Sequence, residues 1–234
     1  MSAEVGGRPP AGVRTTGSQG SGATRLVLVR HGEAACNVAG IVGGRRGCTG
    51  LTQLGVRQAE ALRDRLLRTE ELAATEAVYA SVLARARQTA AVIAPGIGGG
   101  SLAVAEECDL CELHPGEGDG LTWAAFSERF GEPDWDADPT TPLAPGGESW
   151  DGFVDRAAAA LGTLAQRHRG GRVVAVCHAG VIESSLIAFV PVSPRRRLKL
   201  RTAHVSLTEW EHDDDQGWRL LRYNDAAHLG AAGL

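Results

Sequence analysis

Short apolar runs alternate along the chain with longer segments in which apolar residues recur at helical spacing. The run from Leu26 to Val29 is continuous and ends in polar residues, which is typical of a buried parallel strand. Similar runs predict further strands at 77–80, 102–105 and 173–176. Helical spacing of apolar residues predicts helices at 52–68, 84–94, 123–130, 150–169 and 180–189.

The ends of these predicted elements carry recognisable signals. Thr52 is a candidate N-cap, because its hydroxyl can accept a hydrogen bond from the first helical turn. Pro95-Gly96 is expected to end the helix at 84–94. Two alternating segments, 205–210 and 218–223, flank an Asp-rich turn and predict a hairpin. Strands that alternate with helices predict a three-layer α/β/α domain, whose mostly parallel central sheet has helices on both faces.

The composition fits one such domain, since the 234 residues are 43% hydrophobic and 22% charged. Residues 1–23 are rich in Gly, Ser and Pro, so we expect a disordered tail before a domain at 24–230. No apolar run approaches the ~20 residues of a membrane span, and no signal-peptide core precedes the domain. Five cysteines, an odd number, favour reduced thiols and a cytoplasmic protein. A net charge of −4 argues against a nucleic-acid partner.

Two predicted strands end in a histidine that is closely followed by glycine. His31 follows the strand at 26–29, and His178 follows the strand at 173–176. In open α/β sheets, ligands bind at the carboxyl ends of the strands, so these two side chains could meet at one site. Arg85 stands at the start of a predicted helix, where the helix dipole disfavours a cation unless an anion is bound. The pattern therefore indicates an anion-binding site.

Six sequence motifs, in this order, resemble those of the histidine phosphatase (phosphoglycerate mutase-like) superfamily. They are Leu28-Val29-Arg30-His31-Gly32-Glu33 with Asn37, Leu51-Thr52 with Gly55, Ser81 with Arg85-Ala86 and Gln88-Thr89-Ala90, Leu110-Cys111-Glu112 with Gly116, Gly146-Gly147-Glu148-Ser149, and Val176-Cys177-His178-Ala179-Gly180. The resemblance runs from about Arg25 to Leu229. Arg-His-Gly alone would be a weak motif, but the ordered set is specific.

The resemblance implies a role for each matching residue. His31 would be the nucleophile and become a phosphohistidine. Arg30, Arg85 and His178 would surround the phosphoryl group, whose transition state spreads negative charge over three oxygens. Glu112 would protonate the leaving group and later take a proton from the attacking water. We expect no metal and no other cofactor, because the two arginines and the histidine supply positive charge. Four further residues are placed in the substrate-binding set: Asn37, Thr49, Gly50 and Ala179.

The expected reaction is hydrolysis of a phosphomonoester. The stretch from Glu112 to His178 is shorter than in most mutases that the sequence resembles, which favours a phosphatase over a phosphoglycerate mutase-type phosphotransferase. We predict a small helical lid insertion at about 113–151. It carries nine acidic residues against one arginine, Arg129, which disfavours polyanionic substrates. We therefore expect a small metabolite with a single phosphate.

Aromatic residues gather in and beside the predicted lid. Part of this set is a candidate pocket for a ring, as in a nucleoside or sugar phosphate, and helix packing within the lid is the alternative. A non-catalytic regulator that binds a phosphate ligand is a third function, although every expected catalytic residue is present. The six aromatic residues are Trp123, Phe126, Phe130, Trp135, Trp150 and Phe153.

Three cysteines adjoin proposed catalytic residues in the sequence: Cys36, Cys111 and Cys177. We hypothesise that their oxidation inhibits the enzyme, and a role as ordinary small apolar residues is the alternative. Cys108 and Cys111 form a C-x-x-C motif without a second ligand pair at zinc spacing, so no metal site is predicted.

A few positions keep two interpretations. His204 is either structural or at the pocket edge. Arg45 and Arg46 either reach a substrate anion or lie in a surface loop. The run at 195–197 is expected to be an exposed helix start, and the oligomeric state stays open, with a homodimer as one candidate.

Overall fold

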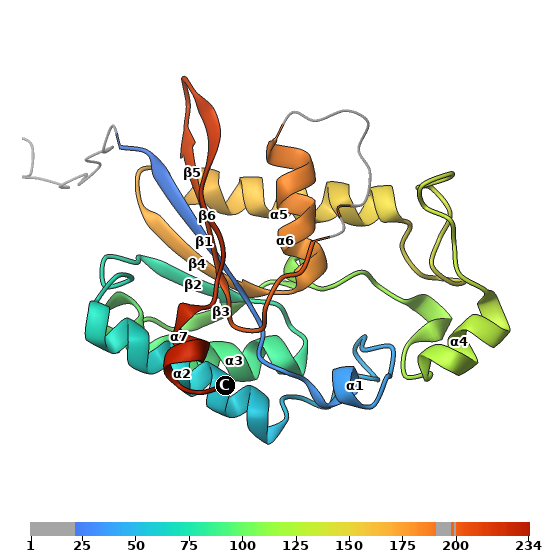
Figure 1. Ribbon diagram of the computed structural model, residues 1–234. Coiled ribbons are helices and arrows are strands. Elements are labelled where there is room, and N and C mark those ends of the chain that lie inside the picture. The colour runs from blue at the N-terminus through green and yellow to red at the C-terminus, as the bar shows by residue number, and fades with distance from the viewer. Residues whose placement is uncertain (1–21, 191–197, 199) are drawn as a thin grey trace, which may run out of the picture.

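The computed structural model describes residues 22–190, 198 and 200–234 (Figure 1). Nearly all of the predicted tail at 1–23, and the arginine run at 195–197, lie outside the described residues. The domain bounds 24–230 therefore stay a prediction. Within the described part of the chain, no helix is long and apolar enough to cross a bilayer.

A six-stranded sheet forms the centre of the described molecule, with the strand order β3-β2-β4-β1-β5-β6. The first four of these are parallel neighbours, and β5 and β6 form an antiparallel hairpin whose β5 pairs antiparallel with β1. The predicted mostly parallel sheet and C-terminal hairpin are confirmed. The strands are β1 (Thr24–Arg30), β2 (Ala77–Ala80), β3 (Val104–Glu106), β4 (Arg172–Cys177), β5 (Leu207–Asp213) and β6 (Gly217–Asp225).

Alternate side chains of β1 enter two separate cores, because successive strand residues point to opposite faces of the sheet. Leu26 and Leu28 pack with α5 and α6, whereas Val27 and Val29 pack with α2 and α3, and all four side chains are fully buried. Figure 1 shows helices on both sides of the sheet, which confirms the three-layer prediction. These helices are α2 (Gln53–Thr69), α3 (Ala84–Ile93), α5 (Trp150–Arg167), α6 (Ala179–Phe189) and the short α7 (Ala227–Ala231), which packs on α2.

Several element ends differ slightly from the prediction. Thr52 does cap α2, accepting a hydrogen bond from the Gly55 N–H at 3.0 Å. The helix predicted at 84–94 ends one residue earlier, and Pro95 lies in a 3₁₀ turn, Ala94–Gly96. The helix predicted at 150–169 ends at Arg167. The strand predicted at 102–105 lies two residues later, because this edge strand is largely exposed and its apolar pattern is weak.

The lid segment, as we call residues 113–151, contains the helix α4 (Trp123–Phe130) and a 3₁₀ turn, Gly116–Gly118. Phe126 of α4 is fully buried against Val42 and Ala144, in a small core separate from the two sheet cores. An isolated bridge between Ile41 and Thr122 joins this segment to the loop that follows α1 (Ala35–Val38). The predicted helical insertion is confirmed, and it lies beside α1 in Figure 1.

Candidate active site

The register of the parallel strands brings the two predicted histidines together. Arg30 of β1 pairs with Cys177 of β4, so the next residues, His31 and His178, leave the two strands side by side. The His31 N–H donates to the Cys177 carbonyl at 3.0 Å, and the ring centroids of His31 and His178 are 5.1 Å apart. The carboxyl edge of the sheet thus forms the site, as predicted.

Arg85 connects the two imidazoles. Its Nε–H is shared between His31 Nε2 at 3.1 Å and His178 Nδ1 at 3.2 Å, and its Nη1 donates to the Gly43 carbonyl at 2.7 Å. The side chain is buried in the first turn of α3, and no carboxylate among the described residues forms an ion pair with it. A buried cation at a helix N-terminus without an anionic partner is an electrostatic site for a phosphate.

His31 is held as a neutral imidazole. Its Nδ1 lies 2.6 Å from the Gly32 carbonyl, so Nδ1 carries the proton and donates, and Nε2 keeps a lone pair. Burial, followed by the charges of Arg85 and Arg30, holds the pKa of His31 well below its usual range. A neutral Nε2 is the form that can attack phosphorus.

His178 is also neutral, with its proton on the other nitrogen. Because its Nδ1 accepts from Arg85, its Nε2 donates to Ser81 Oγ at 2.8 Å. Burial and then the charge of Arg85 hold the pKa of His178 well below its usual range. Ser81 follows β2, so three parallel strands contribute to this network.

Arg30 supplies the second cation. Its Nη1 donates to the Thr202 carbonyl, and its buried Nε has no hydrogen-bond partner among the described residues. An unpaired buried donor is costly unless a ligand accepts from it. Burial first, and then the nearby charge of Arg85, lowers the pKa of Arg30, against the opposing effect of Glu112.

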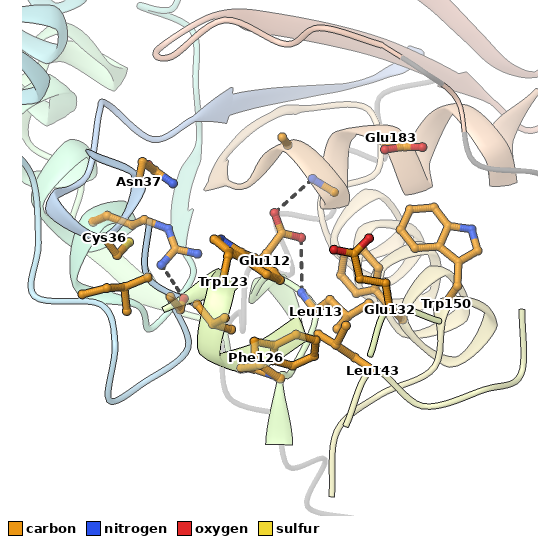
Figure 2. A pocket seen from close by; sticks show the side chains of 18 of the residues that line it. Cys36, Asn37, Glu112, Leu113, Trp123, Phe126, Glu132, Leu143, Trp150 and Glu183 are labelled. Carbon is orange, nitrogen blue, oxygen red and sulfur yellow. Dashed lines mark hydrogen bonds between the residues drawn. The ribbon is translucent and has the colours of Figure 1, made fainter. Parts of the chain in front are cut away.

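Glu112 comes immediately before the lid segment, and its side chain lies among the residues that line the pocket (Figure 2). One carboxylate oxygen accepts from the Gly180 N–H at 3.1 Å and the other from the Leu113 N–H at 3.2 Å. Gly180 must lack a side chain here, because a Cβ would lie 2.2 Å from Glu112 Oε1. The helix N-terminus of α6 thereby orients the carboxylate toward the cavity.

Arg30, His31, Arg85 and Glu112 line one cavity of about 520 Å³, whereas the fully buried His178 is not among its lining residues. Asn37 and Ala179 also line it, whereas Thr49 and Gly50 are not among its lining residues. Gly50 instead turns the backbone with φ 116° and accepts from the Ala35 N–H at 3.0 Å. Substrate contacts by Thr49 and Gly50 stay a prediction.

The cavity wall on the side away from His31 and Arg85 comes mainly from the lid segment. Five of the six aromatic residues singled out in the sequence line it, and Phe130 packs on Phe126 instead. Two carboxylates, those of Glu132 and Glu183, also face this part (Figure 2). The aromatic lining is Trp123, Phe126, Trp135, Trp150 and Phe153.

Sequence reasoning missed several lining residues. Gly43, whose carbonyl accepts from Arg85, was visible only as part of a glycine pair. Ile41 and Val42 gave no chemical signal. Glu183 lies one turn after Gly180 on α6, and this spacing could have placed it at the same helix end.

Three further residues, each of which had two interpretations in the sequence, are placed as follows. His204 lies beside the site, with its ring centroid 5.8 Å from that of His31, and burial lowers its pKa to about 4. Arg46 is largely exposed and pairs with Asp119. Arg45 lines a neighbouring cavity of about 270 Å³ that also reaches Glu112. Within the described residues, no cluster of three or more His, Cys, Asp or Glu side chains could hold a metal ion.

The fold and site together define an α/β protein whose sheet edge places two arginines beside a neutral histidine. The chain belongs to the histidine phosphatase superfamily, branch 1, whose family model matches residues 26–226. This confirms the resemblance noted in the sequence.

Named relatives include both phosphatases and a mutase-like protein. The chain is 35% identical over 216 residues to a metal-independent phosphoserine phosphatase of Arabidopsis thaliana, covering 90% of this chain and 85% of that protein. It is 31% identical over 216 residues to phosphoglycerate mutase-like protein 4 of the same plant, covering 89% and 88% of the two chains. A solved mycobacterial glucosyl-3-phosphoglycerate phosphatase in complex with VO₃ matches with a TM-score of 0.69 and 27% identity, over 86% of this chain and 99% of that one.

Proposed function

We propose that this protein is a metal-independent phosphomonoester hydrolase that works through a phosphohistidine on His31. The observation that carries the proposal is the neutral His31 Nε2, held 3.1 Å from the Arg85 Nε inside a cavity that Arg30 and Glu112 also line. A nucleophile, fixed cations and a carboxyl group are the parts that phosphoryl transfer requires.

In the first step, a bond forms between His31 Nε2 and phosphorus as the ester P–O bond breaks. The leaving alkoxide takes a proton from the carboxyl group of Glu112. In the second step, water attacks phosphorus, its proton passes to the Glu112 carboxylate, and the P–N bond breaks. The products are the alcohol and inorganic phosphate, and His31 and Glu112 return to their starting forms.

Arg30, Arg85 and His178 would stabilise the charge on the phosphoryl oxygens. Arg30 Nε already lacks a partner, and Arg85 is held in place by the Gly43 carbonyl. Burial, followed by the charge of Arg85, lowers the pKa of His178 and favours its neutral form. A bound phosphate dianion would favour the protonated form of His178, so substrate binding is expected to take up a proton.

The substrate is a small metabolite with one phosphate. Glu132 of the acidic lid segment and Glu183 of α6 lie in the cavity wall and disfavour a second phosphate, and the rings of Trp123 and Trp135, which are not buried, offer stacking surfaces for a ring. The phosphoserine and glucosyl-3-phosphoglycerate phosphatases among the relatives are consistent with this class. We further propose a cytoplasmic location, which the five free cysteines support, and a homodimer stays a prediction.

The test is phosphate release from nucleoside monophosphates, sugar phosphates, phosphoserine and 3-phosphoglycerate, with EDTA present. We expect turnover that survives EDTA and is lost in His31→Ala, with His212→Ala on the β5–β6 hairpin as the matched histidine control. Turnover that persists in His31→Ala would overturn the phosphohistidine route, and turnover abolished by EDTA would overturn metal independence.

A second candidate is a phosphoglycerate mutase-type activity, which the mutase-like relative favours. It predicts interconversion of 2- and 3-phosphoglycerate after priming with the bisphosphate, and little phosphate release. Comparing the two rates on the same preparation separates the candidates. Binding of phosphate esters without either reaction would indicate the regulatory alternative.

A further inference from the structure

A largely buried ion pair lies next to residues 111–115, which we call the Glu112 loop, and outside the cavity. Arg156 of α5 forms a bidentate pair with Glu148, with Nε–Oε1 and Nη2–Oε2 distances of 2.7 Å each. The two side chains are only 15% and 19% exposed. Neither residue lines the cavity, so neither is placed to touch a substrate.

The pair holds the backbone on both sides of Glu112. On one side, Arg156 Nη1 donates to the carbonyls of Asp109 at 2.8 Å and Cys111 at 3.1 Å. On the other side, Glu148 Oε2 accepts from the His114 N–H at 2.8 Å, and the Glu148 N–H donates to the His114 carbonyl at 2.9 Å. The anchored positions therefore lie one residue before and two residues after Glu112.

The Glu112 loop is irregular backbone, and its first residue, Cys111, is buried and contacts Ser81. It connects two 3₁₀ turns, Cys108–Leu110 and Gly116–Gly118, rather than regular helices or strands. The Glu112 carboxylate itself accepts two backbone hydrogen bonds, one of them from the adjacent Leu113. A proton donor misplaced by about 1 Å can lose about 100-fold in rate, so the supports of such a loop bear directly on catalysis.

We propose that the Glu148–Arg156 pair is a positioning device for Glu112 in its role as proton donor to the leaving group. This inference rests on the proposed phosphatase function. It makes a specific claim about leaving groups, because an alkoxide needs a proton as the P–O bond breaks, whereas a dinitrophenolate leaves without one. Loosening the pair should therefore slow the cleavage of alkyl esters and spare activated aryl esters.

The experiment compares kcat/KM for phosphoserine and for 2,4-dinitrophenyl phosphate in Glu148→Gln and Arg156→Lys. The value of kcat/KM reports the steps up to and including cleavage of the ester P–O bond, which forms the phosphoenzyme. It does not depend on any later step that limits kcat. We expect a loss of about 10- to 100-fold on the alkyl ester and less than about 3-fold on the aryl ester. Glu112→Gln should show the same selectivity with a larger loss.

Glu71→Gln is the matched control. Glu71 pairs with Arg65 at 2.7 Å, and its side chain is 22% exposed, comparable to that of Glu148. Arg65 of α2 also pairs with Asp225, and within the described residues this cluster makes no hydrogen bond or ion pair with the loop around Glu112. Both esters should react at near wild-type rates in this variant. Combining Glu148→Gln with Glu112→Gln should add no further loss on the alkyl ester, since the two residues would act as one unit.

Three results would overturn the inference. Equal losses on both esters would mean that the pair only supports the fold, and unchanged rates on both would mean that it does not position Glu112. Additive losses in the double variant would mean that the pair acts elsewhere. Should Glu148→Gln fail to fold, Arg156→Lys keeps the charge and carries the same comparison. A wild-type protein that releases phosphate from neither ester would instead refute the proposed function.

Discussion

At the scale of single residues, Arg85 acts together with burial to favour the neutral forms of His31 and His178. A protonated imidazole has no lone pair to accept from the Arg85 Nε–H, so the contacts at 3.1 and 3.2 Å require neutral nitrogens on His31 and His178. The same guanidinium lowers the pKa of both rings after burial has done so. In the proposed mechanism, this one cation favours the neutral form of the nucleophile His31 and would stabilise the charge of the phosphate.

The cysteines near the site differ sharply in expected reactivity. Cys177 is fully buried and burial raises its pKa, and burial also raises the pKa of Cys111, so neither is a good thiolate. The thiols of Cys36 and Cys48 are instead hydrogen-bonded to each other. That bond, followed by the charge of Arg85, lowers the pKa of Cys48, while it raises the pKa of Cys36. The sequence hypothesis named Cys36 but missed Cys48.

We predict that hydrogen peroxide inhibits the enzyme through these two thiols. The Cys48 thiolate would attack hydrogen peroxide, and hydroxide would leave as the O–O bond breaks and a sulfenic acid forms. The Cys36 thiol would then attack the Cys48 sulfur, and one water would leave as the S–O bond breaks and the disulfide forms. Cys36 lines the cavity and packs against Gly43, whose carbonyl anchors Arg85, so the new bond would disturb that anchor. Activity should fall at least about tenfold and return with dithiothreitol.

Peptide mass spectrometry should find the Cys36–Cys48 link in the inhibited sample. Cys48→Ser should remain active after millimolar peroxide, whereas Cys177→Ser should stay sensitive. Wild-type activity that is unaffected by peroxide, or sensitivity that survives in Cys48→Ser, would contradict the prediction.

At the scale of elements, the sequence predicted best those segments whose apolar pattern the core imposes. β1 and β4 are buried on both faces, so their continuous apolar runs are unambiguous. The cap at Thr52 and the histidines at two strand ends were likewise visible as local patterns. The Gly43 carbonyl and the Glu148–Arg156 pair were not, because their roles arise only where segments distant in sequence meet. The order of polar and apolar residues within one segment does not show which distant segment it will contact.

The helix α4 should be tied to the protein mainly by one side chain. Phe126 is fully buried against Val42 and Ala144, with Gly118 beneath its ring, where a Cβ would lie 2.5 Å away. This small core is separate from the cores that hold the sheet. We predict that Phe126→Ala costs about 3–5 kcal/mol of local stability and opens the lid segment without unfolding the sheet.

Hydrogen exchange read by mass spectrometry would locate the effect. Peptides from 117–149 should lose protection in Phe126→Ala while those from β1 and β4 keep it, and KM should rise because the ring lines the cavity. Phe130→Ala, which removes a half-buried ring outside the cavity lining, should do much less. An equal loss of protection in the sheet would refute the idea of a separately stabilised lid.

At the scale of the whole molecule, the strand order explains why residues far apart in the sequence form one site. β4 lies between β1 and β2, so His31, His178 and Ser81 leave three adjacent parallel strands at the same edge. The sheet supplies a rigid frame on which the cations are fixed, and the acidic lid segment covers the opposite side of the cavity. Positive charge thus lies at the His31 end of the cavity and negative charge at the lid end, which is the physical basis of the proposed preference for a substrate with a single phosphate.

Burial of the histidines, which favours their neutral forms, should also make the folded protein less stable in mild acid. Six buried or partly buried histidines have a pKa below the usual 6.5, and for two of them, His204 and His228, it is about 4; the other four are His31, His114, His168 and His178. Below pH 6.5 the unfolded chain binds protons that the folded chain does not, so the free energy of unfolding must fall as the pH falls. Each such proton contributes a slope of about 1.4 kcal/mol per pH unit.

We predict that urea unfolding shows little pH dependence above pH 7 and a steady loss of stability from pH 6.5 toward pH 4.5. His228 gives the cleanest test, because it lies away from the site on α7 and neither of its buried ring nitrogens has a hydrogen-bond partner among the described residues. In His228→Gln, the slope of the free energy of unfolding against pH should fall by the contribution of about one proton. In His212→Gln, the slope should stay unchanged. The carboxylates of Glu148 and Asp225, whose pKa values are lowered, add their effect only at lower pH. A flat profile between pH 6.5 and 4.5 would therefore mean that these imidazoles titrate normally in the folded protein, and would remove the basis for a neutral His31.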